Sequence, residues 1–172
     1  MITPVPGSAG GMGRVVEEYA RRIAARGHEV TVFAPALRAP KNLRTEEPKN
    51  QITGELKNRG SYVITFLRAY VHFGNAAWIP GLAKVLDGFD VVHLHYPFIG
   101  GVGAVLRWKW RTLQGKLVVT YHMDLISRGL TQPLFAIYGW FTTPRILRAA
   151  SRIITASWDY LEHSTFARIF QS

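Results

Sequence analysis

The sequence predicts an α/β fold in which a parallel sheet is covered by helices on both faces. Short apolar segments alternate along the chain with segments of helical periodicity, which is typical of βαβ units. A glycine-rich run, GSAGGMG at residues 7–13, precedes the first helical segment, as at the first turn of a doubly wound sheet. The 172 residues are 48% hydrophobic and 19% charged, which favours one globular domain.

The expected elements follow one another in regular order. Apolar residues at helical spacing, ended by Gly27, predict the first helix over residues 14–26. Further helices are expected at 76–86, at 102–113, in a long apolar segment that ends near 149, and from about 158. Short runs rich in β-branched residues predict strands at 30–35, from 62, at 89–95, at 116–121 and at 152–157. The polar segment 36–60 lacks any period and is expected to be an exposed loop.

The opening strand is an exception to this pattern. A buried strand of about five or six residues normally comes before the first glycine turn of such a sheet. Only Met1, Ile2 and Thr3 are present for it here. We therefore expect a first strand that is a stub or is truncated.

The composition excludes several classes of protein. The absence of cysteine excludes a disulfide scaffold and cysteine-based metal or redox sites, and it agrees with a cytoplasmic location. No segment has the pattern of a signal peptide. No uncharged apolar run reaches the roughly 18–20 residues of a membrane span, since the longest candidate, 129–144, is short and contains two prolines.

The net charge of +10 is unevenly distributed. Residues 91–158 contain eight lysines and arginines but a single acid, Asp124. Such a field favours an anionic partner, which could be a membrane surface, a nucleic acid or a phosphorylated substrate. Because no helix-turn-helix, zinc finger or aromatic-and-basic sheet motif is present, we expect no nucleic acid partner.

The glycine-rich run has two interpretations. Gly10, Gly11, Met12 and Gly13 stand before a helix, where unpaired N–H groups and a partial positive charge can bind a phosphate. Alternatively, the glycines form a tight loop that binds nothing.

Two pairs of polar residues follow or end predicted strands. His122 and Asp124 come directly after strand 116–121, at the edge where open α/β sheets bind ligands, although both could instead be local caps. His93 and His95 alternate and therefore share one face of their strand. A metal site would need a third ligand that the sequence does not place, so no metal is predicted. We expect His93 to be structural and His95, with Tyr96, to face a cleft.

The segment RWKWR alternates cations with two tryptophans. On a helix, residues two apart lie about 200° apart, so one tryptophan is expected to pack inward. The other, with the neighbouring cations, would contact an anionic membrane surface, because aromatic and basic residues together suit the bilayer interface. The alternative is an ordinary core with a solvated basic face. The candidate membrane contacts are Arg107, Trp108, Lys109, Trp110, Arg111 and Trp140.

Four segments resemble, in order and spacing, the N-terminal half of glycosyltransferase family 4. They are GSAGGMGRVVEEYARRIAARGHEVTVFAP, FDVVHLHYPFIGG, VVTYHMD and ASRIITAS. The resemblance implies the GT-B arrangement, in which two Rossmann-like domains face each other across a cleft. It implies an N-terminal domain that holds the acceptor and a C-terminal domain that holds the nucleotide-sugar. The resemblance further implies that the sugar moves with retention of configuration and that no metal or other cofactor is needed beside the nucleotide-sugar co-substrate.

The resemblance also implies roles for particular residues. The loop from Gly10 to Gly13 would approach a donor or acceptor phosphate, and His122 would hydrogen-bond and polarise the transferred sugar without acting as a base. His95, Tyr96 and Asp124 would contact the acceptor, which is lipid-linked in many relatives.

The resemblance covers only the acceptor side of such an enzyme. Residues 1–172 would form that domain, the nucleotide-sugar domain is not represented, and the chain alone would be inactive. The alternative is a non-catalytic Rossmann-like module that binds a phosphorylated ligand or a protein.

Overall fold

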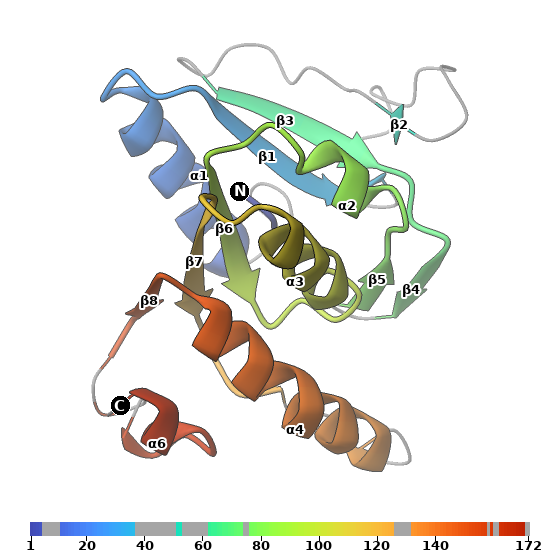
Figure 1. Ribbon diagram of the computed structural model, residues 1–172, viewed down its shortest axis with the longest axis vertical. Coiled ribbons are helices and arrows are strands. Elements are labelled where there is room, and N and C mark those ends of the chain that lie inside the picture. Colours follow the sequence, from blue (N-terminus) through green and yellow to red (C-terminus); the bar gives the residue numbers. More distant parts are fainter. Residues whose placement is uncertain are drawn as a thin grey trace.

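The computed structural model describes residues 1–4, 11–36, 51–52, 62–73, 76–125, 132–157, 159 and 162–170, and it has the predicted α/β fold (Figure 1). The helices are α1 (Gly11–Ala24), α2 (Leu82–Val85), α3 (Val102–Arg111), α4 (Gln132–Ala149) and α6 (Ala167–Phe170). The strands are β1 (Val30–Pro35), β2 (Gln51–Ile52), β3 (Tyr62–Leu67), β4 (Val71–Phe73), β5 (Ala76–Trp78), β6 (Val91–Tyr96), β7 (Lys116–Tyr121) and β8 (Arg152–Thr155).

Two three-stranded sheets meet at the first residues of the chain. In one sheet, β1 and β3 are parallel and β2 pairs antiparallel with β3. In the other, β6, β7 and β8 are parallel. Ile2 forms parallel bridges with Phe33 of β1 and with Leu94 of β6, so it lies between the two sheets.

Backbone hydrogen bonds on both sides hold this stub in place. Ile2 donates to the carbonyl of His93 at 2.8 Å and accepts from the amide of His95 at 3.0 Å. On the other side, the amide of Phe33 donates to the carbonyl of Met1 at 2.8 Å. The order across the sheet is then β2, β3, β1, residues 1–3, β6, β7 and β8, which is the doubly wound order of a Rossmann-type sheet. Residues 1–3 therefore occupy the centre of the sheet.

Helices cover both faces of the sheet, because side chains alternate along each strand. Val16 and Ala20 of α1 pack with Val32 and Ile64 in one apolar cluster. The larger cluster, which contains Phe33, lies on the opposite face beneath α2, α3 and α4 (Figure 1).

Two expectations need correction. The helix predicted over 76–86 begins only at Leu82. Pro80 has no N–H group, so it cannot make the backbone hydrogen bond that a helix through residues 76–80 would need. Residues 76–78 instead form strand β5, which pairs antiparallel with β4. The strands are not all parallel, since β2 and the β4–β5 pair are antiparallel. The predicted loop 36–60 and the start of the last helix lie largely outside the described residues.

We expect Ile2→Ala to lower the free energy of unfolding by about 2–5 kcal/mol, as for other buried isoleucines. Ile2 is 1% exposed and contributes its side chain to the larger core cluster at the junction of the two sheets. Urea unfolding measures the change. As a control, Val63→Ala on β3, where the side chain is 40% exposed, should cost less than about 1 kcal/mol. Equal effects of the two substitutions would contradict a central role for the stub.

Candidate functional site

The carboxyl ends of the stub, β6 and β7 lie at one edge of the sheet. Ile2, Leu94 and Val119 are neighbours in the register, so the chain leaves all three strands at the same level. His122 follows β7 and is therefore about two strand spacings, roughly 10 Å, from the end of the stub. Strand order reverses between the stub and β6, and open α/β sheets bind their ligands outside such a point.

The helix α1 begins inside the glycine-rich run. Gly11, Met12 and Gly13 form its first turn, whereas Gly10 lies outside the described residues. No acidic residue in this turn offsets the partial positive charge of the helix N-terminus. A methyl group on Gly11 would meet no atom within 4 Å, so packing in the described part of the chain does not require glycine there. Gly11 is exposed and Met12 is half-buried, so a ligand could reach the backbone there, whereas Gly13 is buried.

Three histidine rings form a column on the α1 face of the sheet. The centroids of His93 and His95 lie 4.5 Å apart, which confirms that the two share a face, and those of His95 and His122 lie 5.3 Å apart. His93 Nε2 hydrogen-bonds Thr120 Oγ1 at 2.7 Å, and His95 Nδ1 hydrogen-bonds His122 Nε2 at 3.0 Å. Tyr19 of α1 packs against the first two rings, with centroids 5.7 and 6.0 Å away.

Burial keeps this column neutral. Desolvation lowers the pKa of His93 to about 4 and that of His95 to about 2, and neighbouring titratable groups reinforce both shifts. Burial also lowers the pKa of the half-buried His122. A neutral imidazole offers one donor and one acceptor. The chemistry available at His122 is therefore directional hydrogen bonding to a bound group.

Two residues predicted to contact an acceptor are instead buried, which corrects that prediction. His95 is 0% exposed and lies between His93 and His122. Tyr96 is 1% exposed, and its hydroxyl hydrogen-bonds Thr143 Oγ1 of α4 at 2.5 Å on the opposite face. Because α1 and α4 cover the two faces of β6, the end of this strand is enclosed on both sides. Within the described part of the chain, His95 reaches this edge through its hydrogen bond with His122.

Asp124 joins the loop after β7 to the C-terminal segment. One of its carboxylate oxygens accepts from the Tyr121 hydroxyl. The other accepts from the backbone amide and Oγ1 of Thr165, at 3.1 and 3.2 Å. Asp124 therefore has a structural role that its sequence position did not indicate, and its contact with an acceptor stays a prediction.

The two tryptophans of α3 have opposite environments. Trp110 is 70% exposed, whereas Trp108 is fully buried, so the predicted membrane contact of Trp108 is wrong. A Cβ on Gly115 would come within 2.6 Å of the Trp108 ring, which shows how closely the chain packs there. Lys109 Nζ donates to the Gly115 carbonyl at 2.9 Å, and Arg111 pairs with Asp87 at an exposed site.

A larger exposed apolar surface lies on α4. Leu134, Ile137 and Phe141 recur at helical spacing on one side of this helix, and more than half of each side chain is exposed. Arg145 and Arg148 continue the same side toward the C-terminus. We call these five residues the α4 stripe.

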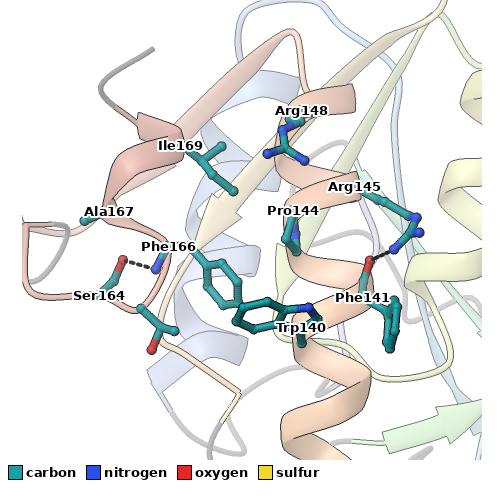
Figure 2. A pocket seen from close by; sticks show the side chains of 10 residues that line it. Trp140, Phe141, Pro144, Arg145, Arg148, Ser164, Phe166, Ala167 and Ile169 are labelled. Atoms are coloured by element: carbon teal, nitrogen blue, oxygen red, sulfur yellow. Dashed lines mark hydrogen bonds between the residues drawn. The ribbon is translucent and has the colours of Figure 1, made fainter.

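A groove of about 690 Å³ runs beside the stripe, between α4 and residues 164–169. Figure 2 shows the rings of Trp140 and Phe166 side by side in this groove, with Arg148 reaching toward Ile169. α4 packs on the face of the sheet opposite α1, so the groove is distinct from the histidine column.

Sequence reasoning missed several of these residues, among them Thr120, Tyr19, Leu134 and Ile137. Thr120 and Tyr19 have no distinctive motif, and only the pairing register and the placement of α1 bring them to the column. In the sequence, Leu134 and Ile137 are as compatible with a buried helix face as with an exposed one. Only the structure shows that both side chains lie on the surface. Among the described residues, no group of three or more His, Asp or Glu side chains could hold a metal ion. Across the same residues, every helix is too short or too polar to cross a membrane.

Comparison with known proteins adds independent information. The sequence pattern of Glycosyltransferase Family 4 matches residues 9–164. The chain is also similar to D-inositol 3-phosphate glycosyltransferase of Acidothermus cellulolyticus, with 29% identity over 171 residues. That alignment covers 90% of this chain but 36% of the relative, so the chain spans about a third of that protein's length.

We expect the protein to lose stability on mild acidification. Histidines of the unfolded chain protonate below a pKa of about 6.5, whereas burial lowers the pKa of His93 to about 4 and that of His95 to about 2. Between pH 7 and 5 the unfolded state therefore binds more protons, and the free energy of unfolding falls by roughly 2–4 kcal/mol for the two residues. Urea unfolding at both pH values measures the loss. His28→Asn, at an exposed position after α1, should keep the same loss, and a stability that does not change with pH would contradict the neutral column.

Proposed function

Because the chain belongs to Glycosyltransferase Family 4, we propose that it is the N-terminal, acceptor-side domain of a glycosyltransferase of GT-B arrangement. The enzyme would transfer a sugar from a nucleotide-sugar to a phosphorylated acceptor, with retention of configuration. The observation that carries this proposal is that His122 and the start of α1 lie toward the same edge of the sheet, the carboxyl edge of its central strands (Figure 1).

The start of α1 supports a role in phosphate binding. Its N–H groups are unpaired within the helix, its first turn has no acid, and Gly11 leaves the backbone uncovered. The relative from Acidothermus cellulolyticus is named for D-inositol 3-phosphate, which is a phosphorylated cyclic polyol. We therefore take a phosphorylated acceptor as the ligand at this edge, with D-inositol 3-phosphate as its probe.

His122 supports a role beside the transferred sugar. Its ring is neutral and is held by His95, so it can orient a sugar oxygen by a hydrogen bond without first losing a proton. Since the chain spans 36% of the relative, we assign the nucleotide-sugar to a second domain outside this chain. The nucleotide-sugar enters as a co-substrate, and no resident cofactor is proposed.

The α4 stripe supports attachment to an anionic membrane surface on the cytoplasmic side. Three exposed apolar side chains and two arginines on one side of a helix provide both apolar burial and attraction to lipid phosphates. The exposed Trp140 and Trp110 have the amphipathic rings that suit a headgroup region. A lipid-linked acceptor would be reached from such a surface.

We expect Gly11→Val and His122→Ala to separate binding from turnover. In the natural polypeptide that contains this chain, Gly11→Val should raise the acceptor KM at least about fivefold, because the new side chain covers the start of α1. His122→Ala should lower kcat roughly 100-fold with a smaller change in KM, the size expected for loss of one preorganised hydrogen bond. Steady-state transfer to D-inositol 3-phosphate measures both values.

The controls separate this enzyme from a non-catalytic binding module. Val71→Ser on the exposed β4 should leave both constants unchanged. Binding of the acceptor to the 172-residue chain without transfer by the natural polypeptide would favour the binding module. No acceptor binding by either polypeptide would overturn the proposal.

We expect the double variant Ile137→Ser and Phe141→Ser to weaken vesicle association at least about tenfold. Both side chains are mostly exposed, so the fold should keep its stability while apolar contact is lost. Sedimentation with phosphatidylglycerol–phosphatidylcholine vesicles measures the association, which should also fall as salt is raised. Val71→Ser is the matched control, because it removes an exposed apolar side chain from β4. Equal loss in both variants, or no association of the unmodified chain, would contradict attachment through α4.

A further inference from the structure

The contact between His95 and His122 determines which nitrogen of His122 is available to a ligand. Only one hydrogen bond joins the two rings, from His95 Nδ1 to His122 Nε2 at 3.0 Å. It uses His122 Nε2. His122 Nδ1 has no hydrogen-bond partner within the described part of the chain, so it is the nitrogen that remains for a bound group.

One proton lies between the two rings, and it can belong to either of them. If His122 is the donor, His95 must accept at Nδ1 and carry its own proton on Nε2. If His95 is the donor, its proton is on Nδ1, its Nε2 has a lone pair, and His122 carries a proton on Nδ1. Both assignments fit the heavy-atom positions, because a neutral imidazole has one donor and one acceptor.

The environment of His95 Nε2 separates these alternatives. This atom is buried and has no hydrogen-bond partner among the described residues. An N–H group without an acceptor is rare in protein interiors, and an acceptor with an unused lone pair is tolerated more often. His95 is therefore expected to keep its proton on Nδ1 and to donate it to His122.

The packing around His95 holds this arrangement in place. The ring is fully buried between His93 and His122, and Tyr19 of α1 packs against it. His93 is itself fixed by Thr120. The His95 ring therefore cannot turn to exchange its two nitrogens without disturbing both neighbours.

We propose that His95 is a positioning residue that fixes His122 as the Nδ1–H tautomer, so that His122 presents a hydrogen-bond donor to the group bound at the edge of the sheet. This proposal deepens the function proposed above, since it specifies the chemistry that His122 offers to a sugar or phosphate oxygen. A donor at this position selects ligands with an acceptor oxygen there. It also explains why His122 would polarise a bound group rather than remove a proton from it.

The tautomer is measured directly on the 172-residue chain by two-bond ¹H–¹⁵N correlation of ring-labelled histidines at pH 7.5, without ligand. We expect His122 to show a protonated Nδ1 and an unprotonated Nε2, and His95 to show the same pattern. The His122 signals are assigned by their loss in His122→Gln. A protonated Nε2 on His122 would overturn the proposal.

Two substitutions at His95 test whether this residue sets the tautomer of His122. His95→Asn places an amide N–H near the position of Nδ1 and should keep His122 in the Nδ1–H form. His95→Phe keeps a ring in the stack but removes the donor, and His122 should shift toward the Nε2–H form that free histidine prefers. If His122 keeps the Nδ1–H form in His95→Phe, His95 does not set the tautomer.

A matched control comes from the other end of the column. His93→Phe also removes a buried ring nitrogen but leaves the hydrogen bond between His95 and His122 intact, so the tautomer of His122 should not change. The unmodified chain decides the tautomer even where a variant fails to fold. Because the measurement involves no acceptor and no transfer, it can succeed where the proposed glycosyl transfer fails, and the two outcomes are distinguishable.

Discussion

The structure depends on the pairing of residues 1–3 with strands on both sides. Ile2 has partners in β1 and β6, and without these hydrogen bonds the two three-stranded sheets would share no bridge in the described part of the chain. The pairing fixes the register between the halves and places Ile2 level with Leu94. It also sends the chain out of the sheet beside β6, where strand order reverses. The helix α1 then begins toward the carboxyl edge of the central strands (Figure 1).

The same register creates the histidine column. Because β6 and β7 are parallel and in register, His95 pairs with Thr120, and His122 follows two positions later, on the same face as Thr120. Burial under α1 then determines the charge of the column. Protonating His93 would cost about 3 kcal/mol relative to the unfolded chain, which follows from a pKa lowered from 6.5 to about 4. This cost is larger than the net contribution of a typical hydrogen bond, so His93 stays neutral in its hydrogen bond with Thr120.

The two faces of the sheet have different surroundings. The α1 face has the neutral histidines and an open helix N-terminus, whereas the α4 face has exposed apolar side chains, two arginines and a groove. The polar groups of Tyr96 and Asp124 connect the strand ends to α4 and to Thr165. These contacts order the edge without occupying its α1 side.

The sequence alone determined the fold class, the order of most elements and the position of His122 and the glycine run relative to them. Those features depend on local periodicity and on strand ends, which short segments specify. The sequence alone could not determine that Pro80 would limit a helix to residues 82–85, or which of the two tryptophans of α3 is buried. The sequence predicted that His95 and Tyr96 both face a cleft, because the position of a strand end gives no information on what covers each face of the strand. Only the tertiary structure decided that α1 and α4 enclose both residues, because burial depends on segments distant in the chain.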